Sequence, residues 1–232
     1  MRRLAALFSG GKDSTHAIHL ALQAGLEVAT LVTARPRRED SYMFHTPNLD
    51  LARLAAEAMG LPHLEVPVSG DPEVEVAELE AGLRPLVDAG TVDGLVAGAI
   101  ASDYQWSRLN AVGHRLGLAC LTPLWRVRPE AVLRDEVASG LRFMIVAAQT
   151  EGLTPEWLGH TVDARLLEQL LATARARRFH PAGEGGEYET LVTDGPLFSR
   201  RIRLDAYHVE MSPTSSRMVV DEAVLVGARG PV

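Results

Sequence analysis

Residues 4–14, LAALFSGGKDS, decide how the rest of the chain is interpreted. The apolar run predicts a short buried strand, and a helical pattern follows the Gly-Gly pair. A strand that ends at two glycines and continues as a helix places the helix N-terminus, with its N–H groups and positive dipole end, just beyond the strand. Junctions of this kind bind phosphate groups. The sequence therefore predicts a phosphate site near the start of the chain.

The side chains of this glycine loop suit a bound polyphosphate. Lys12 supplies a compact cation, and it is the one lysine among 23 basic residues. Asp13 supplies a carboxylate, so we expect Mg²⁺ there. The pattern is not a Walker A loop, because Ala6 stands where that loop needs glycine. We predict Lys12 and Asp13 as catalytic residues. The predicted phosphate-binding residues are Ser9, Gly10, Gly11, Lys12, Asp13 and Ser14.

Composition limits the class of protein. The chain has 232 residues, of which 47% are hydrophobic, so it can form one large or two smaller domains. Its net charge of −7 disfavours extended nucleic-acid binding. No apolar run reaches the length of a membrane span, and a strand begins too early to leave room for a signal peptide, so we expect a cytoplasmic protein without membrane contact. The single Cys120 excludes a disulfide within the chain.

Strand and helix patterns alternate through the first half. We expect strands at 4–8, 28–34, 64–68, 94–99 and 119–121, with helices at 14–24, 48–59, 73–89 and 104–116. Asn48 is the expected N-cap of the second helix. This alternation predicts an α/β fold with a doubly wound, five-stranded parallel sheet. Ligands of such sheets bind beyond the carboxyl ends of the strands.

The second half predicts a smaller α+β part. We expect helices at 130–139 and 163–178, a strand at 141–148, and β structure at 202–226 with a turn at 213–216. The expected domains are 1–126 for phosphate binding and 127–232 for substrate recognition.

A second motif, GAIASDYQWSRL at 98–109, follows the expected fourth strand. Gly98 would let a ligand approach the backbone. Tyr104 and Arg108 are four residues apart and would share one side of a helix, where arginine can bind a phosphate or carboxylate. Ser102 and Gln105 complete the predicted substrate residues of this motif. The alternative is that Ser102 or Asp103 only caps the helix and Arg108 is a surface charge.

A third motif, GEGGEYETLVTDGPLF at 183–198, gathers three carboxylates around a Gly-Gly bend. If a strand starts at Glu187, then Glu187 and Glu189 point to one side and Tyr188 to the other. Neighbouring carboxylates repel unless they bind a cation, so we predict contact with a positively charged substrate group or Mg²⁺. The predicted residues are Glu184, Gly185, Gly186, Glu187 and Glu189. The alternative is an ordinary acidic hairpin.

SGGKDS resembles the PP-loop of the ATP pyrophosphatases. Together with SYMFHT at 41–46, PLW at 123–125 and the two later motifs, it occurs in the order and spacing of the diphthine–ammonia ligase family. The resemblance covers about residues 3–200. It implies an adenine nucleotide α-hydrolase-like domain, and binding of ATP by the loop residues and Gly98. It also implies cleavage of ATP to AMP and pyrophosphate while ammonia converts a carboxylate to an amide. The family substrate is elongation factor 2 carrying diphthine, which has a trimethylammonium group and a carboxylate.

Three functions remain open from the sequence. The first is an AMP-forming carboxylate–ammonia ligase that uses free ammonia, since no glutaminase fits in the chain. The second keeps the adenylation but changes the acceptor, as a bacterial member without diphthamide would require. The third is a non-catalytic module that binds adenine nucleotides. A homodimer is left open.

Overall fold

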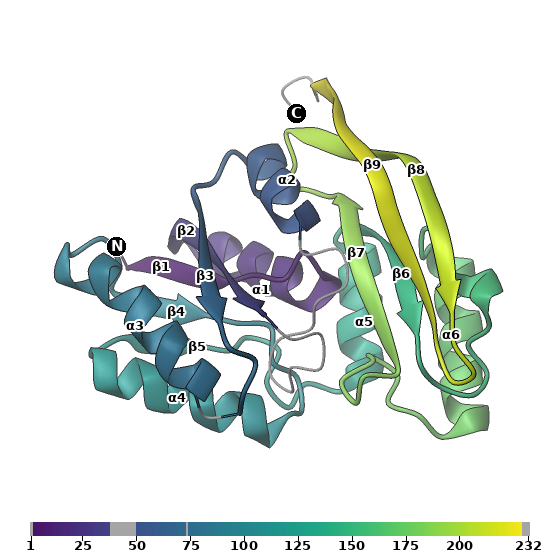
Figure 1. The fold of residues 1–232 in the computed structure, drawn as a ribbon, viewed down its shortest axis with the longest axis horizontal. Coiled ribbons are helices and arrows are strands. Elements are labelled where there is room, and N and C mark those ends of the chain that lie inside the picture. Colours follow the sequence, from purple (N-terminus) through teal and green to yellow (C-terminus); the bar gives the residue numbers. More distant parts are fainter. Residues whose placement is uncertain (1, 38–49, 73, 229–232) are drawn as a thin grey trace.

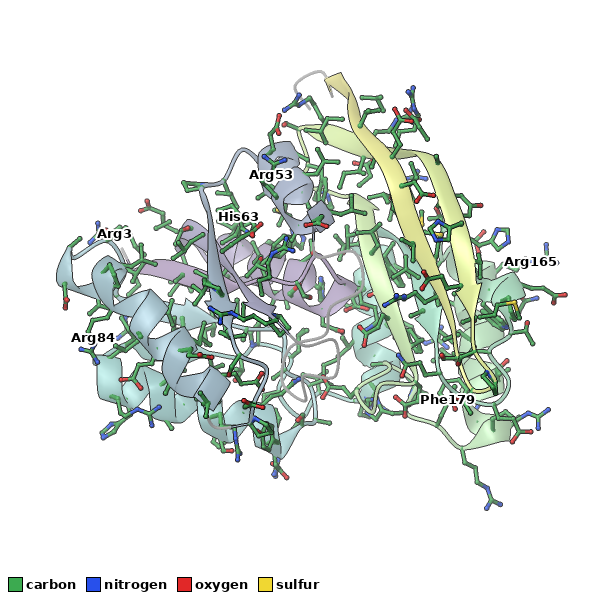
Figure 2. All side chains as sticks on the ribbon, viewed as in Figure 1. Arg3, Arg53, His63, Arg84, Arg165 and Phe179 are labelled. Carbon is green, nitrogen blue, oxygen red and sulfur yellow. The ribbon has the colours of Figure 1, made fainter. Side chains whose placement is uncertain are left out.

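The structure is a computed structural model that describes residues 2–37, 50–72 and 74–228. It contains two β-sheets side by side, each with its own helices (Figure 1). The labelled side chains of Arg3 and Arg165 lie at opposite ends of the long axis, one beside each sheet (Figure 2). Among the described residues, every helix is too short or too polar to cross a bilayer.

The first sheet confirms the predicted five parallel strands. Its strands are β1 (Arg3–Leu7), β2 (Glu27–Pro36), β3 (His63–Val68), β4 (Gly94–Val96) and β5 (Ala119–Leu121). Their order is β3-β2-β1-β4-β5, so the chain leaves β1 in one direction for β2 and β3 and returns to its other side for β4 and β5. Such a reversal opens a crevice at the carboxyl ends of the two strands beside it, β1 and β4.

Helices cover both faces of this sheet, as a doubly wound fold requires. They are α1 (Lys12–Gln23), α2 (Asp50–Met59), α3 (Val74–Asp88) and α4 (Asp103–Leu116). One apolar cluster packs α3 and α4 on the sheet. A second cluster packs α1 and α2 on the opposite face and continues into the other half of the molecule. Because this second cluster is continuous, α1 is buried between the two halves.

The second sheet is antiparallel, in the order β7-β6-β9-β8. The elements of this half are α5 (Pro129–Ala138), β6 (Arg142–Ala148), the short 3₁₀ helix η1 (Pro155–Trp157), α6 (Ala164–Arg177), β7 (Tyr188–Asp194), β8 (Arg200–Met211) and β9 (Ser216–Ala228). The predicted turn near 213–216 is confirmed, and β8 and β9 form a long hairpin at its two sides. Strand β7 is the edge of this sheet that faces the parallel sheet (Figure 1).

Most predicted boundaries differ from the structure by one to three residues, and three of these differences affect the site. Helix α1 starts at Lys12, two residues before the predicted start at 14, so Lys12 and Asp13 belong to its first turn. Strand β4 ends at Val96, so Gly98 lies beyond the strand and packs against the first turn of α1, although the Ala97 N–H still donates to the Leu121 carbonyl of β5 at 3.0 Å. The predicted strand at 187 begins one residue later, at Tyr188. The motif at 41–46 and the cap Asn48 lie outside the described residues.

Candidate active site

A cavity of about 210 Å³ lies at the carboxyl ends of β1 and β4, where they meet the start of β7. This is the crevice that the strand order predicts. Nine of the predicted site residues line it: Ser9, Gly11, Lys12, Asp13, Ser14, Gly98, Gln105, Glu184 and Glu189. Seven others lie near it without lining it: Gly10, Ser102, Tyr104, Arg108, Gly185, Gly186 and Glu187. The fold thus brings all three motifs to one place.

The glycine loop is held by strand β7 from the other half of the molecule. Gly10 has φ of +81°, a conformation that favours glycine, and its carbonyl accepts the N–H of Val192 at 2.9 Å. The N–H of Lys12 donates to Thr190 Oγ1 at 3.1 Å. A Cβ on Gly11 would lie 3.3 Å from Ser9 Oγ and 3.4 Å from the same Thr190 oxygen, so this part of the loop packs directly against β7. The loop conformation therefore depends on β7.

Lys12 has its ammonium buried in the cavity wall. The residue is 1% exposed, and its Nζ donates to Asp13 Oδ2 at 2.7 Å and to the Ala182 carbonyl at 2.8 Å. The Tyr188 ring centre lies 5.6 Å from Nζ, within range of a cation–π contact. Burial alone would lower the pKa of Lys12, but the negative charge of Asp13 and its hydrogen bond to the ammonium oppose burial, and that pKa is raised above its ordinary value. Lys12 is a permanent cation of the site.

Gly98 makes room for protein backbone at this place. A Cβ on it would lie 2.5 Å from the Asp13 carbonyl carbon and 2.7 Å from the Ser14 nitrogen. No real Cβ comes so close to backbone atoms. Gly98 lines the cavity as predicted. The space left by its missing side chain is filled by the backbone of the first turn of α1. Its fit to that turn aligns the second motif with the glycine loop.

Two of the three carboxylates in the acidic motif bind backbone N–H groups. Glu184 accepts hydrogen bonds from Ile100 at 3.1 Å, Ala101 at 3.0 Å and Ser102 at 2.9 Å, so it joins the bend to the start of α4. Glu187 accepts from His180 at 2.9 Å and Gly185 at 2.8 Å. Glu189, the third carboxylate, lines the cavity, and binding of a substrate cation by this motif stays a prediction.

The second motif forms the N-terminal turns of α4. Ser102 is its N-cap and accepts the Gln105 N–H at 3.3 Å. Tyr104 and Arg108 share one side of the helix as predicted, with the guanidinium carbon 3.4 Å from the ring centre. That stacking aligns Arg108 along Tyr104, while Gln105 turns to the cavity. The cap role given as an alternative for Ser102 is present in the structure.

Comparison with known proteins identifies the family. The diphthamide synthase N-terminal domain model matches residues 2–120, and the diphthamide synthase C-terminal domain model matches residues 128–226. This chain belongs to the diphthine–ammonia ligase family. It is 35% identical over 229 residues to the human protein named diphthine–ammonia ligase, covering 89% of this chain and 84% of that protein.

Two more proteins of the same name and one solved structure also match this chain. The zebrafish (Danio rerio) diphthine–ammonia ligase is 36% identical over 225 residues, covering 88% of this chain and 87% of that protein. The Saccharomyces cerevisiae protein of the same name is 30% identical over 228 residues, covering 83% of this chain and 33% of that protein. A solved structure described as a predicted subunit of a tRNA methyltransferase from Methanocaldococcus jannaschii is 18% identical, with a TM-score of 0.44 over 83% of this chain and 96% of that chain.

Motif analysis missed three residues of this diphthine–ammonia ligase family site: Thr190, the ring of Tyr188 and Glu136. Thr190 and Tyr188 belong to the third motif, but their contacts with Lys12 join residues that are far apart in the sequence. Glu136 is fully buried on α5. It did leave a sequence signal, since it follows the buried Val132 and Leu133 by four and three residues, on the apolar side of the helix.

The described residues do not form a preassembled cluster of magnesium ligands. One oxygen of Asp13 is paired with the Lys12 ammonium, and the other is buried and receives no hydrogen bond. Among the described residues there is no group of three histidine, cysteine or carboxylate side chains that could hold a metal ion. The expectation of Mg²⁺ at Asp13 therefore has no support in the geometry.

Proposed function

We propose that this chain is an ATP-dependent ligase that adenylates a substrate carboxylate, releases pyrophosphate, and forms an amide with ammonia. The observation that carries the proposal is the buried Lys12 ammonium beside the glycine loop, in a cavity that all three motifs adjoin. The family supports the same reaction, because its named members are diphthine–ammonia ligases. We further propose that residues 1–126 bind ATP and residues 127–232 recognise the acceptor.

In the proposed reaction, the phosphate end of ATP binds against the glycine loop. An oxygen of the substrate carboxylate attacks the α-phosphorus, and the bond from this phosphorus to the β-phosphate oxygen breaks. Lys12 stabilises the charge that develops on the leaving pyrophosphate, and Ser9 and Ser14 offer hydroxyl groups beside it. Ammonia then attacks the acyl carbon, and AMP leaves. The residues supply positioning and electrostatic stabilisation, and no general base is assigned.

The acceptor is proposed from the family as diphthine on elongation factor 2. Its trimethylammonium group suits a carboxylate in the cavity wall, and Glu189 occupies such a position. We keep Ser102, Tyr104, Gln105, Arg108, Glu184, Gly185, Gly186 and Glu187 as proposed parts of the acceptor side. Within this group, Gln105 and Glu184 line the cavity, and the others would act through them.

Three further properties belong to the proposal. Mg²⁺ would reach the site on the phosphates of ATP, which together with water provide the oxygen ligands this ion prefers. The proposed location is the cytoplasm. A homodimer is proposed as the assembly to test, by light scattering of the purified chain.

Analysis of the products of ATP turnover tests the reaction. The chain is incubated with ATP, ammonium and elongation factor 2 that carries diphthine, and the nucleotides are separated. We expect one AMP and one pyrophosphate for each amide formed, and no turnover by Lys12→Ala. Formation of ADP and phosphate would overturn the reaction class. AMP formation with another carboxylate, but not with diphthine, would overturn only the acceptor. ATP binding without AMP for any carboxylate would favour the non-catalytic alternative.

A further inference from the structure

Glu136 is a buried carboxyl group that the proposed reaction does not use. It lies on α5, is 0% exposed, and neither of its oxygens accepts a hydrogen bond from the described residues. An ionised carboxylate without hydrogen bonds in a protein interior is very costly. The environment therefore favours the neutral acid, which has one O–H to donate.

The Asp13 side chain offers the matching acceptor. Its Oδ1 is also buried and receives no hydrogen bond from the N–H and O–H groups of the described residues. The two carboxyl groups lie next to each other, and the residue before Glu136 on α5, Asp135, contacts α1 through His16 at 2.9 Å. Two carboxylate oxygens cannot hydrogen-bond unless one of them carries a proton. A single shared proton would satisfy both groups.

The surroundings indicate which group carries this proton. Asp13 Oδ2 is already paired with the Lys12 ammonium at 2.7 Å, whereas neither Glu136 oxygen has a hydrogen-bond partner among the described residues. Burial raises the pKa of Glu136 well above its ordinary value, and the negative charge of Asp13 adds to that increase, although Lys12 opposes it. The acid is therefore Glu136, and the cluster of Lys12, Asp13 and Glu136 has no net charge.

We propose that Glu136 is a positioning residue that donates a hydrogen bond from its neutral carboxyl group to Asp13 Oδ1. Asp13 Oδ2 in turn holds the Lys12 ammonium at the cavity wall. Because Glu136 is on α5 and Lys12 is on α1, this chain of contacts fixes the lysine against the second half of the molecule. The functional part of this inference rests on the proposed role of Lys12 in stabilising pyrophosphate.

Two uncharged variants of similar size test whether position 136 needs a hydrogen-bond donor. Glu136→Gln keeps a donor for Asp13, and Glu136→Met keeps the bulk without one. We expect the Gln variant to keep kcat for AMP formation within about threefold of the parent, and the Met variant to lose about 10- to 100-fold, as for a lost hydrogen bond to a charged group. The apparent KM of the acceptor should change less than kcat in the Met variant.

The proton itself can be observed without turnover. Infrared spectra of the parent should contain the carbonyl stretch of a protonated, buried carboxylic acid, and Glu136→Gln should lose that band. Thermal unfolding checks that each variant is folded, and if Glu136→Met is not, the infrared comparison of parent and Gln variant still decides.

The proposal fails if the Gln variant loses as much activity as the Met variant, because a charge would then be required. It also fails if the Met variant equals the parent, or if the infrared band is absent. A parent that forms ADP would refute the proposed reaction but leave the infrared test of Glu136 intact.

Discussion

Two ion pairs of almost equal length differ in burial, because one lies in the site and the other on the exposed β8–β9 hairpin. In the site, Lys12 Nζ lies 2.7 Å from Asp13 Oδ2, and the two side chains are 2% and 27% exposed. On the β8–β9 hairpin, His208 Nδ1 lies 2.9 Å from Asp221 Oδ2, and the side chains are 51% and 49% exposed. Water and salt screen the second pair but barely reach the first. Distance alone therefore does not indicate how much a charged contact contributes.

The partners of each pair sharpen this contrast. The Lys12 pair is surrounded by the Ala182 carbonyl, the Tyr188 ring and Glu136, which leave few other positions for the ammonium. The His208 pair lies beside other exposed pairs, such as Arg217 with Glu210. Removal of a buried charge leaves its partner without compensation, whereas an exposed partner is rehydrated. The variants that follow test this difference, from the largest expected effect to the smallest.

Lys12→Ala should have the largest effect. It removes the cation beside the glycine loop and leaves the Asp13 carboxylate unpaired, so AMP formation should fall by at least about 10³-fold. Stability should fall by about 3 kcal/mol, the low end for a broken buried pair, because Asp13 is partly exposed. Product analysis and denaturant unfolding measure the two effects. Arg217→Ala on the hairpin is the control, and equal losses in both variants would contradict the comparison.

Gly98→Ala should come second. Its Cβ would lie 2.5 Å from the Asp13 carbonyl carbon, so the first turn of α1 must move away from β4. We expect a loss of about 1–3 kcal/mol in stability, as for overpacking, together with reduced affinity for ATP. Gly90→Ala is the control, because Gly90 has a φ of +62° that disfavours alanine, yet a Cβ added there would have open space within 4 Å. Unfolding and ATP titration of both variants distinguish the clash from backbone strain.

Glu184→Gln tests whether this carboxylate holds α4 or binds a substrate. The amide has one acceptor oxygen, so at least one of the N–H groups of Ile100, Ala101 and Ser102 loses its partner, at a cost of about 1–3 kcal/mol. Hydrogen exchange at these amides should become faster. Glu156→Gln at an exposed position is the control. Unchanged exchange with an increased acceptor KM would instead favour direct binding of the substrate.

Local sequence patterns were sufficient to predict much of the fold. The apolar runs and Gly-Gly junction place the five parallel strands, and the same pattern places the phosphate loop at their carboxyl edge. These predictions succeed because strand, turn and helix signals depend on neighbouring residues. The start of α1 at Lys12 was missed because apolar periodicity says little about the first helical turn, where capping and tertiary contacts decide.

The remaining details of the site depend on contacts between distant parts of the chain. Thr190 binds the Lys12 N–H across 178 residues, and no local pattern specifies that pairing. Glu184 was predicted from its charge as a ligand for a cation, but its contacts with α4 arise only when the two halves pack. Glu136 is the exception, since a glutamate on the apolar side of an amphipathic helix indicates a buried acid from the residue pattern alone.

The smallest effect concerns the pH dependence of the hairpin pair. The hydrogen bond with Asp221 raises the pKa of His208 above its ordinary value of 6.5, with burial opposing slightly. The folded state thus binds more protons than the unfolded state between that value and the raised pKa. The stabilisation is fully present below 6.5 and is lost as the pH rises through the raised pKa.

The variant Asp221→Asn tests this pH dependence. NMR titration should find a lower pKa for His208 in the variant than in the parent. The free energies of unfolding at about pH 5.5 and about pH 9 should also differ less in the variant than in the parent. AMP formation should not change, because the hairpin pair does not line the cavity. An unaltered His208 titration would show that solvent screens even this contact at 2.9 Å.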